Sequence, residues 1–281
     1  MIIDSHCHAW RFWPYVPTVP DPESRGKIEQ LLWEMDQNGV DRAALVCARI
    51  DHNPDDNDYI AGAVKRFPDR LYQIADVDCE WWPTYQAPGA ADRLAEAVAA
   101  YHLKGFTHYV RKSDDGAWYL SAEGDAFFDK AAELKQIVSL SIPAHLQPVL
   151  REVARRHPTV HFLCHHMAGA RASEAAPYPI LADILRSGDS PNIHVKMSGF
   201  HYVSASPWGF PYLDCTRIVQ ALFESFGPER LHWGSDYPVV RKAMTYQHSL
   251  EAFRSHCAFI PPHQQSLILG DSLLALLETA G

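Results

Sequence analysis

The sequence predicts an α/β protein, a single-domain (β/α)8 TIM barrel with an extra C-terminal helix, spanning residues 1–281. Apolar, β-rich runs alternate with helical patterns along the whole chain. The runs are almost continuously apolar, as in Ala43–Ala48, which is typical of parallel strands buried on both faces. We count eight strand–helix units, the number that closes such a barrel.

Several predicted strands begin after a helix-ending signal. Pro68 and Pro158 stand between a helical pattern and the next apolar run, and proline cannot continue a helix. The predicted strands are Ile2–His8, Arg42–Ile50, Arg70–Asp78, Leu103–Val110, Gln136–Ile142, Thr159–His165, Asn192–Ser198 and Arg230–Asp236.

The helices are delimited by similar signals. Asn53 is followed by Pro54, a capping residue and then a first-turn proline, whereas Gly39 and Gly227 are typical of helix ends. The predicted helices are Ser24–Asn38, Pro54–Phe67, Ala90–Tyr101, Ser121–Leu134, His145–Arg156, Tyr178–Arg186, Tyr212–Phe226, Tyr246–His256 and a final one at Pro262–Thr279. A doubly wound open sheet is the alternative, but no Gly-x-Gly-x-x-Gly segment follows the first strand.

The composition excludes some classes of partner. A net charge of −9 disfavours nucleic acid and anionic membranes, which need a basic surface. No apolar run approaches the roughly 18–20 residues that span a bilayer, and the start lacks a signal-peptide pattern. The six cysteines show no Cys-x-x-Cys spacing, so we expect free thiols and a cytoplasmic protein.

The candidate site lies where the strands end, because barrel enzymes carry their functional groups at the carboxyl ends of strands. His6 and His8 are two residues apart in a strand, so both side chains face the same way and Cys7 faces the other. Asp236 ends the last strand. Two imidazoles and a carboxylate are the materials of a metal site or a water-activating site.

Other polar residues follow strands four, six, seven and eight: Arg111, Lys112, His165, His166, Lys196, His201, Tyr202 and Tyr237. We expect one of His165 and His166 to face the barrel and the other the helices, and the spacing to Ala168 favours His166 inside. Histidines that precede or begin strands are read as structural: His102, His157 and His232. The aromatic, proline-rich loop Ala9–Glu23 is either a binding lid, a cap on the barrel or a subunit contact.

Four segments together resemble the amidohydrolase superfamily, in the amidohydrolase-2 branch of sugar lactonases and 2-pyrone-4,6-dicarboxylate lactonase. They are His6-Cys7-His8, Cys164-His165-His166-Met167-Ala168-Gly169, Val195-Lys196-Met197-Ser198-Gly199 and Gly234-Ser235-Asp236-Tyr237-Pro238. The resemblance covers nearly the whole chain. It implies a barrel that hydrolyses a small substrate by water attack, without a covalent intermediate, with His6, His8, His166 and Asp236 at motif positions.

Asp236 is the expected general base, and His6, His8 and His166 polarise the substrate carbonyl, directly or through one divalent ion such as Zn²⁺ or Mn²⁺. The same four residues would then be the metal ligands. Metal-dependent relatives commonly carry another histidine at the end of strand five, where this chain has none closer than His145. The sequence therefore leaves open whether a metal is required.

The leading hypothesis is a hydrolase that opens a small lactone, of a sugar acid or of a pyrone or muconolactone type. Its substrate, an anionic or polyhydroxylated small molecule, would be held by Arg111, Lys196, His201, Tyr202 and Tyr237. A metal-dependent decarboxylase of an aromatic or semialdehyde acid, using His145, is the alternative. The third hypothesis is a non-catalytic member that binds a small molecule. By analogy with the superfamily, a homodimer is expected.

Overall fold

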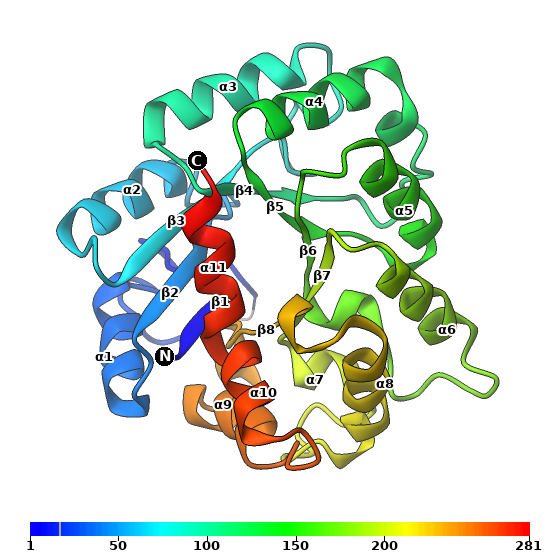
Figure 1. Ribbon diagram of the computed structural model, residues 1–281. Coiled ribbons are helices and arrows are strands. Elements are labelled where there is room, and N and C mark those ends of the chain that lie inside the picture. Colours follow the sequence, from blue (N-terminus) through cyan, green and yellow to red (C-terminus); the bar gives the residue numbers. More distant parts are fainter. Residues whose placement is uncertain (17) are drawn as a thin grey trace.

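Eight parallel strands form one sheet in the order β1 to β8 (Figure 1). The structure, a computed structural model, describes residues 1–16 and 18–281. The strands are β1 (Ile3–Cys7), β2 (Arg42–Val46), β3 (Leu71–Asp76), β4 (Gly105–Tyr109), β5 (Ile137–Ser141), β6 (Phe162–Cys164), β7 (Ile193–Met197) and β8 (Leu231–Trp233). The backbone of Asp236 donates to His6, 2.7 Å away, and links the last strand segment to the first. The predicted (β/α)8 barrel is confirmed.

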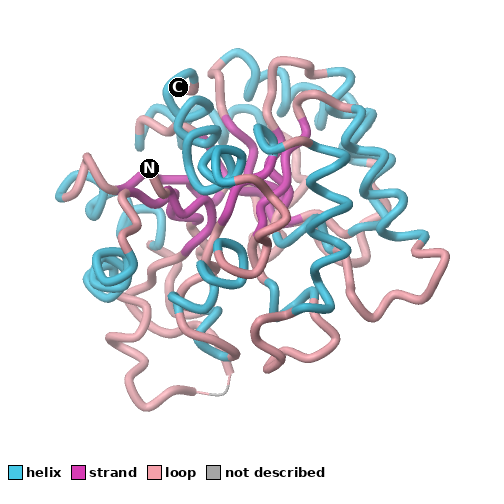
Figure 2. Tube along the Cα trace, turned by 60° about the horizontal axis from the view of Figure 1, so that its bottom comes forward, coloured by secondary structure: helices cyan, strands magenta, loops and turns pink. Residues whose placement is uncertain are grey.

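Helices surround the strands, as Figure 2 shows. They are α1 (Ile28–Asn38), α2 (Asp56–Arg66), α3 (Ala90–Tyr101), α4 (Ala122–Glu133), α5 (Gln147–Arg156), α6 (Pro179–Arg186), α7 (Phe200–Val203), α8 (Thr216–Phe226), α9 (Tyr246–Arg254), α10 (Pro262–Ser266) and α11 (Ser272–Thr279). The short α7 was not predicted. None of the helices that the structure describes is both long enough and apolar enough to cross a membrane.

The final helix differs from the prediction, because the π-turn Leu267–Asp271 separates α10 from α11. The cause is a close backbone approach at Gly270, where an added Cβ would lie 2.7 Å from the carbonyl oxygen of Met1. Beyond this turn α11 (red in Figure 1) runs across one end of the barrel. Its Leu273 and Leu277 pack with Ile3 and close the barrel interior at the amino ends of the strands.

β1 contains an irregularity that bears on the site. Asp4 of β1 pairs with Ala43 of β2, and the next pair is Cys7 with Leu45. Between these two pairs β1 advances by three residues and β2 by two. One extra residue is therefore accommodated in β1, as in a β-bulge, which re-aims the side chains that follow. Cys7 packs in the main hydrophobic core, as expected of a residue that faces away from the barrel axis. All six cysteines are buried free thiols, as predicted.

Candidate active site

A cavity of about 510 Å³ opens at the carboxyl ends of the strands. Residues from seven strand ends and the loops after them line it: His8, Tyr15, Glu80, Tyr109, Val110, Lys112, Ser141, Ile142, Pro143, Ala144, His165, His166, Gly169, Arg171, Tyr202, Asp236 and Val239. Three of the four residues predicted as catalytic are among them, and the fourth, His6, lies completely buried beside Asp236. His6, His8, His165 and His166 therefore gather at the end of the barrel where the sequence predicted the functional residues.

Three imidazoles surround one carboxylate oxygen. Oδ1 of Asp236 lies 3.6 Å from Nε2 of His6, 3.5 Å from Nε2 of His8 and 4.0 Å from Nε2 of His166. Asp236 is only 1% exposed. Its other oxygen, Oδ2, has no hydrogen-bond partner among the residues that the structure describes. One carboxylate oxygen is thus free to accept a proton from a water molecule or a substrate.

The electrostatics favour an ionised carboxylate next to neutral rings. Burial on its own raises the pKa of Asp236, but His166 and His8 lower it, and the net shift is below the usual value. Burial and the nearby His165 hold the pKa of His6 well below its usual value. Burial also lowers the pKa of His166 to about 4. Near neutral pH Asp236 is therefore a base, and these two rings are uncharged.

The donor set suits a divalent cation. Ligand atoms of His6, His8 and Asp236 lie within 4.8 Å of one another, and so do those of His6, His165 and His166. Nε2 of His6 and Oδ2 of Asp236 are buried without hydrogen-bond partners among the described residues, so they are available as ligands. Imidazole nitrogen and carboxylate oxygen are ligands that Zn²⁺ and Mn²⁺ accept. The residues present therefore fit the expected metal.

Both members of the His165–His166 pair face the barrel interior, whereas one was expected to face the helices. Nε2 of His165 lies 2.8 Å from Oγ of Ser139 in β5, and its ring centroid is 4.4 Å from that of His6. The alternation of side chains stops where β6 ends at Cys164. His166 then takes a left-handed backbone conformation, with φ of 48°, which turns its ring to the same side.

Four of the five residues predicted to hold the substrate, all except Tyr202, do not line the cavity. Lys196 is buried in β7, with Nζ bonded to Ser139, and burial lowers its pKa to about 7. Tyr237 is buried against Tyr246. Arg111 lies outside because its guanidinium covers the ring of Tyr85.

The other two predicted substrate residues are Tyr202, near His166, and His201, near Tyr202. Tyr202 lines the cavity, and its ring centroid is 5.1 Å from that of His166. His201 packs on Tyr202 and is mostly buried, and neither ring nitrogen has a partner in the described part of the chain. His145, the alternative metal ligand, lies apart from both metal-capable groups, because its Nε2 meets the carbonyl oxygen of Asp114 at 2.9 Å.

Tyr15, from the aromatic loop Ala9–Glu23, lines the cavity, whereas sequence reasoning did not single out Tyr109, Arg171 and Glu80. Tyr109 was within reach of prediction, because it is the last residue of β4 and functional groups were expected at the carboxyl ends of strands. Arg171 comes from the loop after β6, where no periodicity indicates direction. The only hydrogen bond of its side chain within residues 1–16 and 18–281 goes to the carbonyl oxygen of Ala170, so its charge has no carboxylate partner there.

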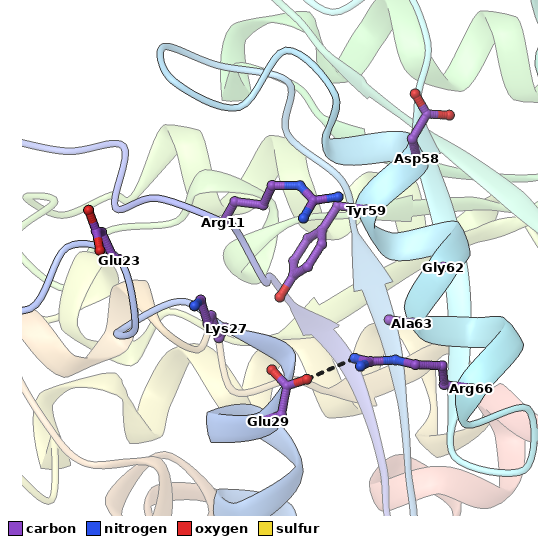
Figure 3. Close-up of a pocket in the computed structure, with 9 residues that line it drawn as sticks. All are labelled: Arg11, Glu23, Lys27, Glu29, Asp58, Tyr59, Gly62, Ala63 and Arg66. Carbon is purple, nitrogen blue, oxygen red and sulfur yellow. Dashed lines mark hydrogen bonds and ion pairs between the residues drawn. The ribbon is translucent and has the colours of Figure 1, made fainter.

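A second hollow, of about 580 Å³, lies on the flank of the barrel between α1 and α2 (Figure 3). Its wall includes the ion pair of Arg66 and Glu29, 2.8 Å apart, together with Arg11 and Tyr59. Its charges are mixed, and Arg11, Glu29 and Arg66 form ion pairs. None of the predicted catalytic residues lines it, so the cavity around Asp236 is the candidate active site.

Comparison with curated proteins finds two lactonase relatives. An L-fucono-1,5-lactonase from Burkholderia ambifaria is 26% identical over 258 residues, which are 86% of this chain and 81% of that protein. An L-fucono-1,5-lactonase from Burkholderia multivorans is 27% identical over 269 residues, with coverage of 87% and 84%.

Solved structures share the fold. A zinc-bound amidohydrolase from Burkholderia multivorans superposes with a TM-score of 0.79 at 20% identity, and 99% of each chain is covered. A probable 2-pyrone-4,6-dicarboxylic acid hydrolase from Acinetobacter baumannii gives a TM-score of 0.74 at 19% identity, again with 99% of each chain. The sequence model of the amidohydrolase family matches residues 3–272. With this match over nearly its whole length, the chain belongs to the amidohydrolase family.

Proposed function

We propose that the protein is a lactonase, which opens a small lactone by attack of water. The observation that carries the proposal is the buried, ionised Asp236, whose Oδ1 lies within 3.5–4.0 Å of three imidazoles beside a cavity of about 510 Å³. Lactone hydrolysis needs a base for the water, a group that polarises the carbonyl and a proton for the leaving oxygen. This group of residues offers all three.

In the proposed reaction Asp236 takes a proton from water while the oxygen of that water attacks the lactone carbonyl carbon. An imidazole N–H donates to the carbonyl oxygen as it becomes an oxyanion. The tetrahedral intermediate collapses, the ring C–O bond breaks, and the leaving oxygen takes the proton back from Asp236. The product is the open hydroxy acid. The depressed pKa of Asp236 keeps it in the base form at the start of each cycle.

A divalent ion would be held by His6, His8 and Asp236, and when bound it supplies Lewis-acid polarisation of the carbonyl. His8 is oriented for such a role, because its Nδ1 lies 2.7 Å from the carbonyl oxygen of Val46 and its Nε2 faces Asp236. We propose Zn²⁺ or Mn²⁺ as the ion, in keeping with the nitrogen and oxygen donors.

The substrate that we propose is a sugar-acid lactone. The L-fucono-1,5-lactonase relatives support this class, and the mixed wall of the cavity suits hydroxyl groups, which both donate and accept. Lys112 and Arg171 line the cavity, and Asp236 and Glu80 are the acidic residues among its described lining, so we propose that the cavity also suits a carboxylate on the lactone. The alternative of a decarboxylase depends on His145, which the structure holds at Asp114.

The test is turnover of a panel of aldono-1,5-lactones and 2-pyrone carboxylates, followed by the acid released in a pH-indicator assay. The protein is assayed as purified, after chelation, and after addition of Zn²⁺ or Mn²⁺. We expect opening of at least one sugar lactone. If every lactone stays intact under all three conditions while the protein is folded, the proposal is wrong.

A further inference from the structure

We propose that Lys196 is a positioning residue that fixes the ring proton of His6 on Nε2 and thereby weakens metal binding by the group of His6, His8 and Asp236. The inference rests on the proposed site but not on the identity of the lactone. This role would explain why a buried lysine contacts His6, one of a set of residues that could otherwise bind a cation.

The surroundings of Lys196 leave it two partners. Its side chain enters the barrel interior from β7 and is 1% exposed. Nζ lies 2.7 Å from Oγ of Ser139 and 3.3 Å from Nδ1 of His6. In residues 1–16 and 18–281 no carboxylate forms an ion pair with it. A buried lysine normally has an acidic partner, so the hydroxyl and the imidazole here take that place.

The direction of these hydrogen bonds determines where the histidine protons lie. The amino group donates to Oγ of Ser139 and to Nδ1 of His6, which makes Nδ1 an acceptor. The proton of His6 is then on Nε2, 3.6 Å from Oδ1 of Asp236. Ser139 passes its own O–H to Nε2 of His165, 2.8 Å away, so the proton of His165 is on Nδ1. One lysine thereby sets the tautomers of two rings.

His8 shows the opposite arrangement. Its Nδ1 lies 2.7 Å from the carbonyl oxygen of Val46, and a carbonyl only accepts, so the proton of His8 is on Nδ1. The lone pair of Nε2 then points at Asp236. Metal-binding histidines commonly have this outer partner, an acceptor on the far nitrogen. Of the two neighbouring rings, His8 is therefore prepared to bind a metal, whereas Lys196 prepares His6 to donate a hydrogen bond to the substrate oxyanion.

The experiment combines ring ¹⁵N NMR with zinc titration of the full-length protein. Selective ¹⁵N-histidine labelling and long-range ¹H–¹⁵N correlation report which ring nitrogen carries the proton, and His6→Gln assigns the His6 signals. We expect the metal-free wild type to show His6 protonated on Nε2. In Lys196→Met we expect loss of this preference and Zn²⁺ affinity, measured against a competing chelator, that is tighter by about tenfold or more, the range of outer-partner effects.

Two further variants separate the hydrogen bond from charge and from packing. Lys242→Met removes a lysine whose charge also acts on Asp236 but which forms no hydrogen bond to His6, and it should leave the His6 tautomer unchanged. Lys196→Gln keeps an N–H donor and should restore the wild-type tautomer. A wild-type spectrum with His6 protonated on Nδ1 overturns the proposal, and this result does not require Lys196→Met to fold. If Lys196→Met folds, an unchanged affinity for Zn²⁺ also overturns the proposal. Neither measurement uses lactone turnover, so the result for Lys196 does not depend on whether the protein proves to be a lactonase.

Discussion

Gly234 follows β8, and its replacement by alanine tests how tightly the junction between β8 and β1 holds the site. A Cβ at this position would lie 2.8 Å from Cβ of His6, 2.9 Å from its backbone nitrogen and 3.0 Å from Oγ of Ser5. Two of these atoms belong to the backbone or the first side-chain carbon of His6, so they cannot move aside alone. His6 and Asp236 are also joined by a backbone hydrogen bond of 2.7 Å. The added methyl group must therefore displace residues of the candidate active site.

We expect Gly234→Ala to lower the free energy of unfolding by about 1–3 kcal/mol, the usual cost of overpacking a close-packed site. At about 2–4 °C per kcal/mol for a chain of this size, Tm falls by several degrees. Turnover should fall by up to about 10²-fold, since displacements near 1 Å misalign reacting groups. Circular dichroism in guanidinium gradients and lactone assays measure both effects.

Gly62→Ala is the matched control, because Gly62 lies in α2 with no atom within 4 Å of the added Cβ, apart from its chain neighbours and the backbone of its own helix. Alanine stabilises a helix interior by up to about 1 kcal/mol relative to glycine, so this variant should be as stable as the wild type or more so. A Gly234→Ala protein with wild-type stability and turnover would refute the argument that this junction fixes the geometry of the site.

Further predictions concern the base, the cavity wall and the barrel interior. Asp236→Asn should lower lactone turnover by about 10²–10⁴-fold with unchanged circular dichroism, whereas Asp271→Asn, at a surface pair with the N-terminus, should not. Arg171→Ala should raise KM about tenfold for a lactone that carries a carboxylate and little for a neutral one, which initial-rate kinetics on both substrates will decide. Burial lowers the pKa values of His161, His194 and His232, the last to about 3, so the unfolded chain binds more protons below its histidine pKa of about 6.5. Unfolding free energy should therefore decrease as pH falls from 7 to 5, and a flat profile in urea melts would contradict this.

The barrel was predictable because its signals are local and repeated. A strand buried on both faces is apolar throughout, and prolines such as Pro68 and Pro158 mark where helices end. The meeting of His6, His8 and Asp236 was predictable for a geometric reason, since the carboxyl ends of parallel strands gather at one end of a barrel. Residues separated by more than 200 positions in the sequence could thus be brought together without knowing any loop.

Positions beyond the strand ends were less predictable. His166 adopts a left-handed conformation without being glycine, so no residue preference indicated that it would face the same side as His165. Tyr237 follows Asp236 directly, yet its hydroxyl is directed to the carbonyl oxygen of Arg25 rather than to the cavity. Alternation is a property of strands, and it gives no information on side chains in the turns that follow.

The barrel interior shows why the polar residues of this site belong together. One side is apolar, with Ala44, Val46 and Ile74 packed together. On the other side imidazoles form a chain, in which His194 lies 3.0 Å from both His161 and His232. Buried polar groups destabilise a core unless they are hydrogen-bonded, and apolar residues would have filled this side at lower cost. The hydrogen bonds from Lys196 through Ser139 to His165 connect this polar side of the interior to the candidate site at the open end of the barrel.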